Sequence, residues 1–365
     1  MSLTYKKSGV NYDIVDPIKK LAQELGLKTA GNIRSTGFKE RSESRGESSY
    51  VIESADGFYA FVTEGLGTKN LVADEMHKIT GKIYYESIAQ DCVAMIVNDL
   101  ITVGAKPVTV LAYWAVGDTN WFSDLKRASS LVEGWKKACD MAGCSWGGGE
   151  TPVQSGVVNP SIIDLAGSSF GVIKPKKRLI LGDKLKEGDS IILLESSGIH
   201  ANGLTLARRI ARKLKTGYAT KLPNGSLYGD ELLKPTIIYS MLINDLLERG
   251  IDIHYLVNIT GHGWRKLMRA KKTLSYVLEN VPDISELFKF IQKNSNLTDK
   301  EMFATFNMGA GFAMMTNQSQ VDKIIRIAGK HKIKCWVAGR VEKGLRQVVI
   351  KPKNITYLSK DLKIR

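Results

Sequence analysis

Short apolar runs along the chain alternate with longer segments in which apolar residues recur at helical spacing. The apolar runs predict strands at Ser49–Glu53, Phe58–Glu64, Val108–Ala115, Ser161–Val172, Ser190–Leu194 and Ile333–Val341. Apolar residues repeating every three or four positions predict helices at Glu86–Gly104, Trp121–Ala142, Asn202–Leu214 and Pro235–Glu248. Because strands and helices alternate in both halves, we expect an α/β (α+β) protein in which helices are layered on sheets.

One basic, proline-containing stretch, Lys174-Pro175-Lys176-Lys177, interrupts both spacings. We therefore expect two domains, residues 1–174 and 175–365, which agrees with a length of 365 residues at about 150 residues per domain. Within the first domain, Gly31–Ser48 is polar and charged and nearly lacks large apolar residues. We expect this segment to be a mobile loop.

Composition excludes several classes of protein. With 43% hydrophobic and 24% charged residues, the chain is neither disordered nor a disulfide-stapled miniprotein. It has no apolar run of membrane-spanning length, and Met1–Val10 lacks a signal-peptide core. We therefore expect a cytoplasmic protein with no membrane segment and with reduced thiols at Cys92, Cys139, Cys144 and Cys335.

The formal net charge is +15, and the excess is uneven. His331–Arg365 contains ten Lys or Arg against two Asp or Glu, a net of +8. A basic surface can attract nucleic acid, acidic lipid or phosphorylated small molecules. The basic regions do not interleave aromatic residues, as single-strand binders do, so a solvated basic face is the simpler interpretation.

The first candidate motif, Thr63-Glu64-Gly65-Leu66-Gly67-Thr68-Lys69, directly follows a predicted strand. Gly65 and Gly67 would let the backbone approach an anion, while Thr68 and Lys69 supply a hydroxyl and a positive charge. The P-loop spacing is absent. The alternative is a plain turn with an exposed lysine.

The second candidate lies on the predicted helix Glu86–Gly104. Asp91 and Asn98 are seven residues apart and share one face, and Asp99 lies beside them. Acids and an amide on an otherwise apolar helix suit oxygen ligation of Mg²⁺. The alternative is a polar stripe that caps neighbouring loops.

Two further glycine-bearing loops follow. In Gly147–Thr151 the glycines, Gly148 and Gly149 among them, allow either tight backbone packing or close approach to phosphate. Glu150 is a candidate metal ligand or base, and a simple turn is the alternative for the whole motif.

Ser196–Gly203 follows a strand and opens a helix, where free N–H groups attract anions. Ser197, His200 and Asn202 could contact a substrate there, or Ser197 and Asn202 could simply cap the helix. A Ser-His-Asp nucleophile is not supported, because the GxSxG motif is missing.

The order of the motifs carries more information than any one of them. TEGLGTK, DCVAMIVNDL with a following GAKP, GCSWGGGET, DLAG, SSGIHANG, LLKPT, TGHGW and TFNMGAGF occur in succession. This succession resembles the phosphoribosylformylglycinamidine cyclo-ligase family, also called aminoimidazole ribonucleotide synthetase, over about residues 63–341. TFNxGxG and VNDLxxxGAxP point to this family more than to its thiamine-monophosphate kinase, hydrogenase-maturation or selenophosphate-synthetase relatives.

The resemblance implies a fold and an activity. It implies two domains with mixed β-sheets, and a homodimer in which the N-terminal sheets of two subunits form a barrel across the interface. It also implies an ATP- and Mg²⁺-dependent ligase of de novo purine biosynthesis. That enzyme acts on a phosphorylated small molecule, formylglycinamidine ribonucleotide, closes its imidazole ring to aminoimidazole ribonucleotide, and releases ADP and phosphate.

The resemblance also implies roles for individual residues. Asp91, Glu64 and Glu150 would bind the metal; His200, Lys69 and Asp91 would be catalytic. Ser197, His200 and Asn202 would face the substrate. The nucleotide would contact Gly65, Gly67, Thr68, Lys69, Asn98, Asp99, Gly148 and Gly149.

Four positions depart from the family pattern. Glu64 stands where aspartate is usual, Ala201 where serine is usual and His262 where glycine is commoner. The glycine-rich N-terminal loop of the family is absent, and the charged segment 31–48 offers Arg34, Lys39, Arg41 and Arg45 in its place. These departures leave two alternatives open: another ATP-dependent enzyme of the same superfamily with a changed substrate, or a non-catalytic, basic nucleic-acid-binding protein.

Overall fold

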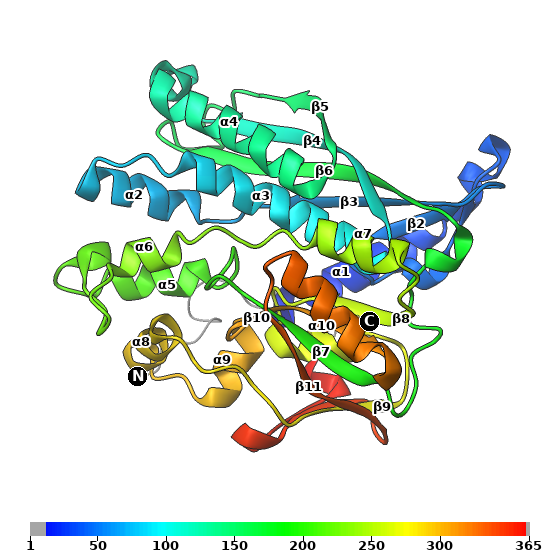
Figure 1. The fold of residues 1–365 in the computed structure, drawn as a ribbon. Helices are drawn as coiled ribbons and strands as arrows, with labels where there is room; N and C mark the ends of the chain where they lie inside the picture. Colours follow the sequence, from blue (N-terminus) through cyan, green and yellow to red (C-terminus); the bar gives the residue numbers. More distant parts are fainter. Residues whose placement is uncertain (1–11, 363–365) are drawn as a thin grey trace.

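The first of two sheets has six strands in the order β1-β2-β3-β6-β4-β5. The computed structural model describes residues 12–362 of the chain (Figure 1). All neighbours in this sheet pair antiparallel except β4 and β5, which run parallel, so the sheet is mixed. Its strands are β1 (Lys39–Glu40), β2 (Tyr50–Glu53), β3 (Phe58–Gly65), β4 (Lys106–Val116), β5 (Ser145–Glu150) and β6 (Ile163–Ile173).

Helices cover one face of this sheet and leave the other open. The covering helices are α2 (Asn70–Thr80), α3 (Tyr85–Leu100) and α4 (Leu125–Ala142) (Figure 1). Strand alternation places Ala60 and Val62 under the helices, whereas Phe61 on the opposite face is 40% exposed. Leu111 of β4, 42% exposed, lies on the same open face. The N-terminal half therefore presents an apolar sheet face to solvent.

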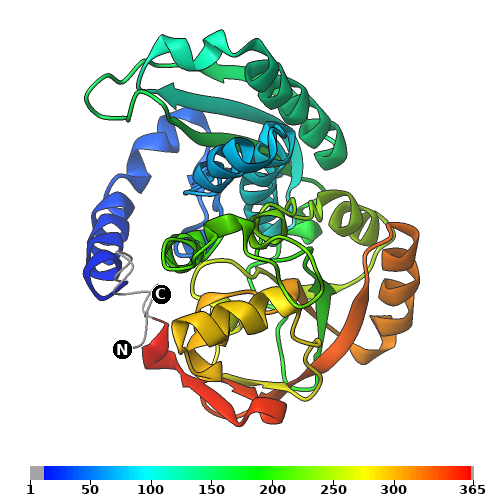
Figure 2. The same ribbon diagram turned by 90° about the vertical axis from the view of Figure 1, so that its left-hand side faces the viewer.

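The second sheet has seven strands in the order β13-β12-β9-β11-β7-β10-β8. They are β7 (Ser190–Glu195), β8 (Ile253–Asn258), β9 (Leu274–Leu278), β10 (Ala310–Thr316), β11 (Cys335–Lys343), β12 (Gln347–Ile350) and β13 (Ile355–Leu358). The helices of this half are α5 (Leu204–Ala211), α6 (Tyr228–Leu232), α7 (Ser240–Glu248), α8 (Glu286–Ser295), α9 (Asp299–Thr305) and α10 (Val321–Lys330). α7 and α10 lie on one side of the sheet, and α8 and α9 lie on the other (Figure 2). Both faces are therefore covered, and β8 and β10 are buried along their whole lengths.

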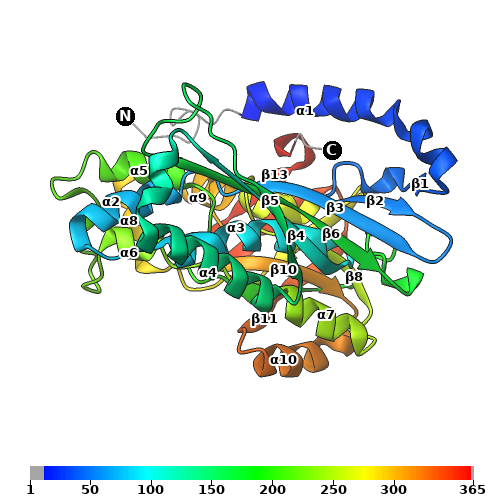
Figure 3. The ribbon, with the colours of Figure 1, turned by 90° about the horizontal axis from the view of Figure 1, so that it is seen from above.

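An amphipathic helix, α1 (Tyr12–Leu27), runs along the outside of the molecule next to both halves (Figures 2 and 3). Asp16 of α1 is buried 3.6 Å from the Nε2 atom of His262 in the C-terminal half. At the other end of the helix, Arg45 donates to the carbonyl of Gly26 and pairs with Glu40 at 2.6 Å. These contacts hold α1 against the rest of the chain.

The predicted α/β architecture with two sheets is confirmed, and each predicted strand corresponds to an observed one. Three local predictions are corrected. The segment 31–48 is not simply a loop, because it contains β1 and two 3₁₀ turns, Ala30–Thr36 and Ser42–Ser44. The glycines of 147–149 lie in β5 rather than in a turn. The helix predicted from Pro235 begins at Ser240, because residues 235–239 have no regular secondary structure and bond to α3.

The first sheet is open at both edges, so the described residues form no closed barrel within one chain. No helix within residues 12–362 is both long enough and apolar enough to cross a bilayer.

Candidate active site

A cleft of about 310 Å³ opens where the end of β3 meets the segment that follows β8. Helix α3 contributes its last turns, and α1 closes one side. The polar side chains that line the cleft are Lys19, Gln23, Glu47, Glu64, Asp99, Asn202, Thr260, His262, Lys266 and Arg269. We call it the Glu64–Asp99 cleft, after the two carboxyl groups at its floor.

Glu64 and Asp99 lie close enough to share a proton. Glu64 ends the alternating inward face of β3, and Asp99 occupies the last turn of α3. Burial and the neighbouring charge of Asp99 raise the pKa of Glu64 to about 7. Asn258 fixes the other carboxyl group by donating to Asp99 Oδ1 at 2.8 Å. Two neighbouring carboxyl groups, one of them with a raised pKa, mark a position that a divalent cation could fill.

Cationic side chains face this carboxyl pair from the C-terminal half. Lys266 is buried, and burial lowers its pKa to about 8; its ammonium donates to Thr260 Oγ1 at 2.5 Å. Arg269 directly follows the 3₁₀ segment Gly263–Met268, which contains Lys266, and it donates to Ser48 Oγ at 2.5 Å. Carboxylates opposite cations can hold a metal ion and the phosphate oxygens that the metal ion bridges.

Lys69 and Asp91 form a buried ion pair outside this cleft. Their Nζ and Oδ1 atoms are 2.8 Å apart, and neither side chain is exposed. Oδ1 also accepts from the amide and hydroxyl of Thr236, and Lys69 donates to the carbonyl of Lys234. Burial lowers the pKa of Lys69 and raises that of Asp91, while their mutual attraction opposes both shifts. Within the described residues, Asp91 Oδ2 has no hydrogen-bond partner.

Asn98 also forms hydrogen bonds with the segment 234–239. Its Nδ2 donates to the carbonyl of Ile237, and its Oδ1 accepts from the amide of Tyr239. Gln90, two turns earlier on α3, donates to the carbonyl of Thr236. Hydrogen bonds from Gln90, Asp91 and Asn98 therefore hold α3 against residues 234–239 along most of the helix.

The predicted substrate loop is split between buried and cleft-facing residues. His200 is buried, and burial together with the charge of Lys69 lowers its pKa to about 3. Its Nε2 accepts from the amide of Ser197, whose hydroxyl donates to the carbonyl of Pro235. His200 is consequently neutral across the physiological pH range and orients the loop. Asn202 lies in the Glu64–Asp99 cleft.

The glycine motifs occupy two separate places. Gly65 is the last residue of β3, and Gly67 and Thr68 lie in the turn between β3 and α2, with both glycines exposed and Gly67 at a φ of 78°. The N-terminus of α2 follows directly, so its amides lie next to this turn.

Gly148, Gly149 and Glu150 lie on β5 at the far edge of the sheet, with β6 and β4 between them and β3. Glu150 is exposed there. Gly149 is required by packing, because a Cβ atom at this position would lie 2.0 Å from the carbonyl oxygen of Ala112.

The structure thus brings together Glu64, Asp99 and Asn202 among the predicted site residues, and places Asp91 and Glu150 elsewhere. Within residues 12–362, no three His, Cys, Asp or Glu side chains gather closely enough to hold a metal by themselves. The motifs did not single out Glu47, Lys266 and Arg269, which also line the cleft. Lys266 and Arg269 follow the TGHGW motif within five residues, and this proximity was the available signal.

Family profiles match both halves of the chain. "AIR synthase related protein, N-terminal domain" covers residues 46–173, and "AIR synthase related protein, C-terminal domain" covers residues 186–351. The chain belongs to the AIR synthase family. The predicted resemblance is confirmed by curated relatives of this family. The phosphoribosylformylglycinamidine cyclo-ligase of Methanococcus vannielii is 35% identical over 342 residues, 93% of this chain and 92% of the relative. The enzyme of the same name from Carboxydothermus hydrogenoformans is 34% identical, covering 95% and 98%.

Solved structures of more distant proteins share the AIR synthase fold. HypE in the HypE–HypF complex gives a TM-score of 0.61 at 19% identity, covering 86% of this chain and 93% of the other. PurL of T. maritima complexed with FGAR gives 0.60 at 16%, covering 92% and 50%. AaThiL complexed with AMPPCP and TMP gives 0.59 at 15%, covering 92% and 96%. At such identities the likeness shows the fold alone.

Proposed function

We propose that this protein is a phosphoribosylformylglycinamidine cyclo-ligase of the cytoplasm. In this activity the γ-phosphoryl group of ATP passes to the formyl oxygen of formylglycinamidine ribonucleotide. The amidine nitrogen then attacks the formyl carbon, which closes the ring. The oxygen leaves with phosphate, and the products are ADP, phosphate and aminoimidazole ribonucleotide. The observation that carries the proposal is the Glu64–Asp99 pair facing Lys266 and Arg269, in a chain 35% identical to a relative of that name. The four free cysteines agree with the proposed location.

The residues of the Glu64–Asp99 cleft fit Mg²⁺ and a nucleotide triphosphate. Mg²⁺ binds one or two carboxylates and completes its shell with water and phosphate oxygens, so a pair of carboxylates suffices. When bound, the ion would shield the negative charge of the transferring phosphate. Glu64 and Asp99 are the ligands we propose, and the exposed turn at Gly65–Thr68 would approach the nucleotide phosphates.

The chain's own groups would then orient the reaction. Lys266, with its pKa near 8, is mostly protonated at pH 7 and can donate to a phosphoryl oxygen. Asn202 faces the same cleft and can donate to the substrate. We propose Lys69, Asp91 and His200 as positioning residues, because all three are buried and bonded within the protein. The metal-ligand roles of Asp91 and Glu150 remain predictions from the family resemblance.

Phosphate release tests the proposed activity. Purified full-length protein with ATP, Mg²⁺ and formylglycinamidine ribonucleotide should release phosphate and form aminoimidazole ribonucleotide in equal amounts. Folded protein that turns over ATP with a different phosphorylated acceptor, but not with this one, would identify a paralogue with a changed substrate. That alternative is favoured by the charged segment 31–48, which carries Arg34, Lys39, Arg41 and Arg45 where the family has a glycine-rich loop.

We expect the affinity for Mg²⁺ to fall about tenfold from pH 8 to pH 6, because the metal must displace the proton held by Glu64 near pKa 7. Above pH 7 the carboxyl group is ionised and ready to bind; below pH 7 its proton competes. Titration with Mn²⁺ alone, followed by electron paramagnetic resonance, measures this affinity without a nucleotide. Glu64→Gln should bind weakly at both pH values, and an unchanged pH slope in this variant would contradict the assignment.

We also propose a homodimer in which the open faces of two N-terminal sheets form a barrel. The face carries Phe61, Leu111 and Val108, each at least 40% exposed, beside the stacked rings of Tyr59 and Phe170. A contiguous apolar sheet face of this kind is costly in water and suits a second copy of the same chain.

Leu111→Asp should convert this dimer to a monomer, because it would bury one charge per subunit in an apolar interface. Light scattering after gel filtration measures the mass. Val132→Asp is a matched control, since Val132 is also 42% exposed but lies on α4, on the helix side of the sheet. A Leu111→Asp protein that remains dimeric would rule out this face as the interface.

A further inference from the structure

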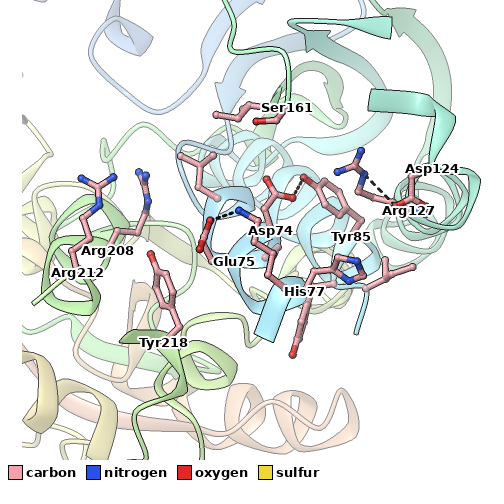
Figure 4. A pocket seen from close by; sticks show the side chains of 16 residues that line it. Asp74, Glu75, His77, Tyr85, Asp124, Arg127, Ser161, Arg208, Arg212 and Tyr218 are labelled. Atoms are coloured by element: carbon pink, nitrogen blue, oxygen red, sulfur yellow. Dashed lines mark hydrogen bonds and ion pairs between the residues drawn. The ribbon is translucent and has the colours of Figure 1, made fainter. Parts of the chain in front are cut away.

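A second cavity, larger than the Glu64–Asp99 cleft, lies at the opposite end of α3. Its volume is about 510 Å³, within the usual range for small-molecule sites. It is enclosed by α2, the start of α3, the start of α4, and the segment from α5 to Tyr218 (Figure 4). Tyr85, which lines it, and Asp99 are fourteen residues apart on one helix, or about 20 Å. None of the residues proposed above for metal or nucleotide lines this cavity.

Most charged groups in the cavity are already paired. Lys78 bonds to Glu75 at 2.7 Å, and Asp74 accepts from the hydroxyl of Tyr85 at 2.8 Å. Arg127 donates to the carbonyl of Trp121 and lies 4.3 Å above its ring, with Asp124 beside it. Figure 4 shows the bond between Asp74 and Tyr85, and Arg127 beside Asp124.

Two arginines line the other side of the cavity. Arg208 and Arg212 are four residues apart on α5 and its end, so they share one face, and their side chains extend side by side (Figure 4). Neither forms an ion pair with a carboxylate among the described residues. Like charges at this spacing repel each other, so an anion between them would relieve a destabilising contact.

Arg208 lies beside aromatic side chains of the cavity wall. Burial raises the pKa of Tyr218, whose ring stacks on Tyr228 at 6.5 Å between centroids, and the nearby charge of Arg208 opposes that rise. Because the phenol of Tyr218 is neutral, it leaves the charge of the guanidinium uncompensated. The site therefore has a half-buried cation, Arg208, and a more exposed one, Arg212.

We propose that this cavity binds a phosphate monoester, with Arg208 and Arg212 gripping the phosphate and the apolar wall of Leu71, Ile83 and Tyr84 covering the organic part. A phosphate monoester carries between one and two negative charges at pH 7, which matches the two uncompensated guanidinium groups. Paired arginines also fit the fork geometry of phosphate oxygens. This binding site goes beyond the proposed ligase chemistry, since it lies outside the Glu64–Asp99 cleft.

Calorimetric titration of the full-length protein, without ATP or Mg²⁺, tests the proposal. Ribose 5-phosphate should bind, and uncharged ribose should not. Arg212→Gln and Arg208→Gln should each weaken binding of ribose 5-phosphate about tenfold, as expected when one charge-assisted contact is lost. Lys213→Gln is the matched control, because it removes one positive charge from the adjacent exposed position outside the cavity and should leave the affinity unchanged.

Equal affinities of the wild type and Arg212→Gln for ribose 5-phosphate, or no binding by the wild type, would overturn the proposal. Arg212 is exposed, so this variant folds even if Arg208→Gln does not. Steady-state kinetics then identify the source of the phosphate. If Arg212→Gln raises KM for formylglycinamidine ribonucleotide at constant kcat, the phosphate is that of the substrate. If both constants are unchanged while ribose 5-phosphate binding is lost, the ligand is a separate phosphorylated molecule. The calorimetric titration requires no turnover, so its result is independent of the test of the proposed function.

Discussion

Replacing Asp99 by asparagine should lower ATP-dependent turnover about 10²–10³-fold, the scale of loss when one preorganised electrostatic group is removed from an active site. Asp99→Asn keeps the shape of the side chain and the oxygen that accepts from Asn258. It removes the charge that would bind Mg²⁺ beside Glu64. The measurement is phosphate release at saturating Mg²⁺.

The same variant should be at least as stable to heat as the wild type. Two buried carboxyl groups in contact destabilise the fold when both are ionised, and an amide at position 99 abolishes that repulsion. Asp140→Asn is the control for the chemical change, since Asp140 lies exposed on α4 and pairs there with Lys136. An Asp99→Asn enzyme with near wild-type turnover would exclude Asp99 from the metal site.

Asp91→Asn should lower the free energy of unfolding by about 3–5 kcal/mol, because it leaves the ammonium group of Lys69 buried without a counter-charge. Urea denaturation measures the change. We expect turnover to fall as well, through displacement of the segment at Thr236, which bonds to Asp91 through both its amide and its hydroxyl.

A double variant separates this interpretation from direct metal ligation. Lys69→Met combined with Asp91→Leu removes both charges and should recover most of the lost stability, as apolar replacement of buried ion pairs does elsewhere. If Asp91→Asn instead abolished turnover at unchanged stability, the metal-ligand role predicted from the family resemblance would be favoured.

The parts of the fold that the sequence predicted correctly are those in which burial dictates residue type. β7 is a continuous apolar run because both of its faces are covered, so its position can be read without a structure. Helix α1 was missed although Ile14, Ile18 and Leu21 have helical spacing, since Pro17 and several charges lie among them. The glycine run of β5 does not predict a strand, because glycine is rare in strands. Gly149 is needed there because β4 approaches closely, a tertiary contact whose position the local pattern does not encode.

The residues of the candidate site also differ in how far the sequence predicts them. Glu64 and Asp99 belong to motifs, and their order along the chain identified the family. Their cationic counterparts, Lys266 and Arg269, come from a segment with no distinctive spacing, and only folding brings them opposite the acids. The sequence singles out Lys69 and Asp91 as candidate catalytic residues, but helical spacing cannot tell whether a buried acid faces a ligand or a lysine.

Because α3 is hydrogen-bonded to residues 234–239, the exchange of two backbone amides measures how readily the two halves of the chain separate. The amides of Thr236 and Tyr239 donate to Asp91 and Asn98, side chains of the other half of the chain, rather than to carbonyls of their own segment. Their exchange with deuterated solvent therefore requires the two halves to separate at this seam. Rapid exchange at these two positions, with slow exchange inside β7 and α3, would reveal opening between intact halves before either half unfolds.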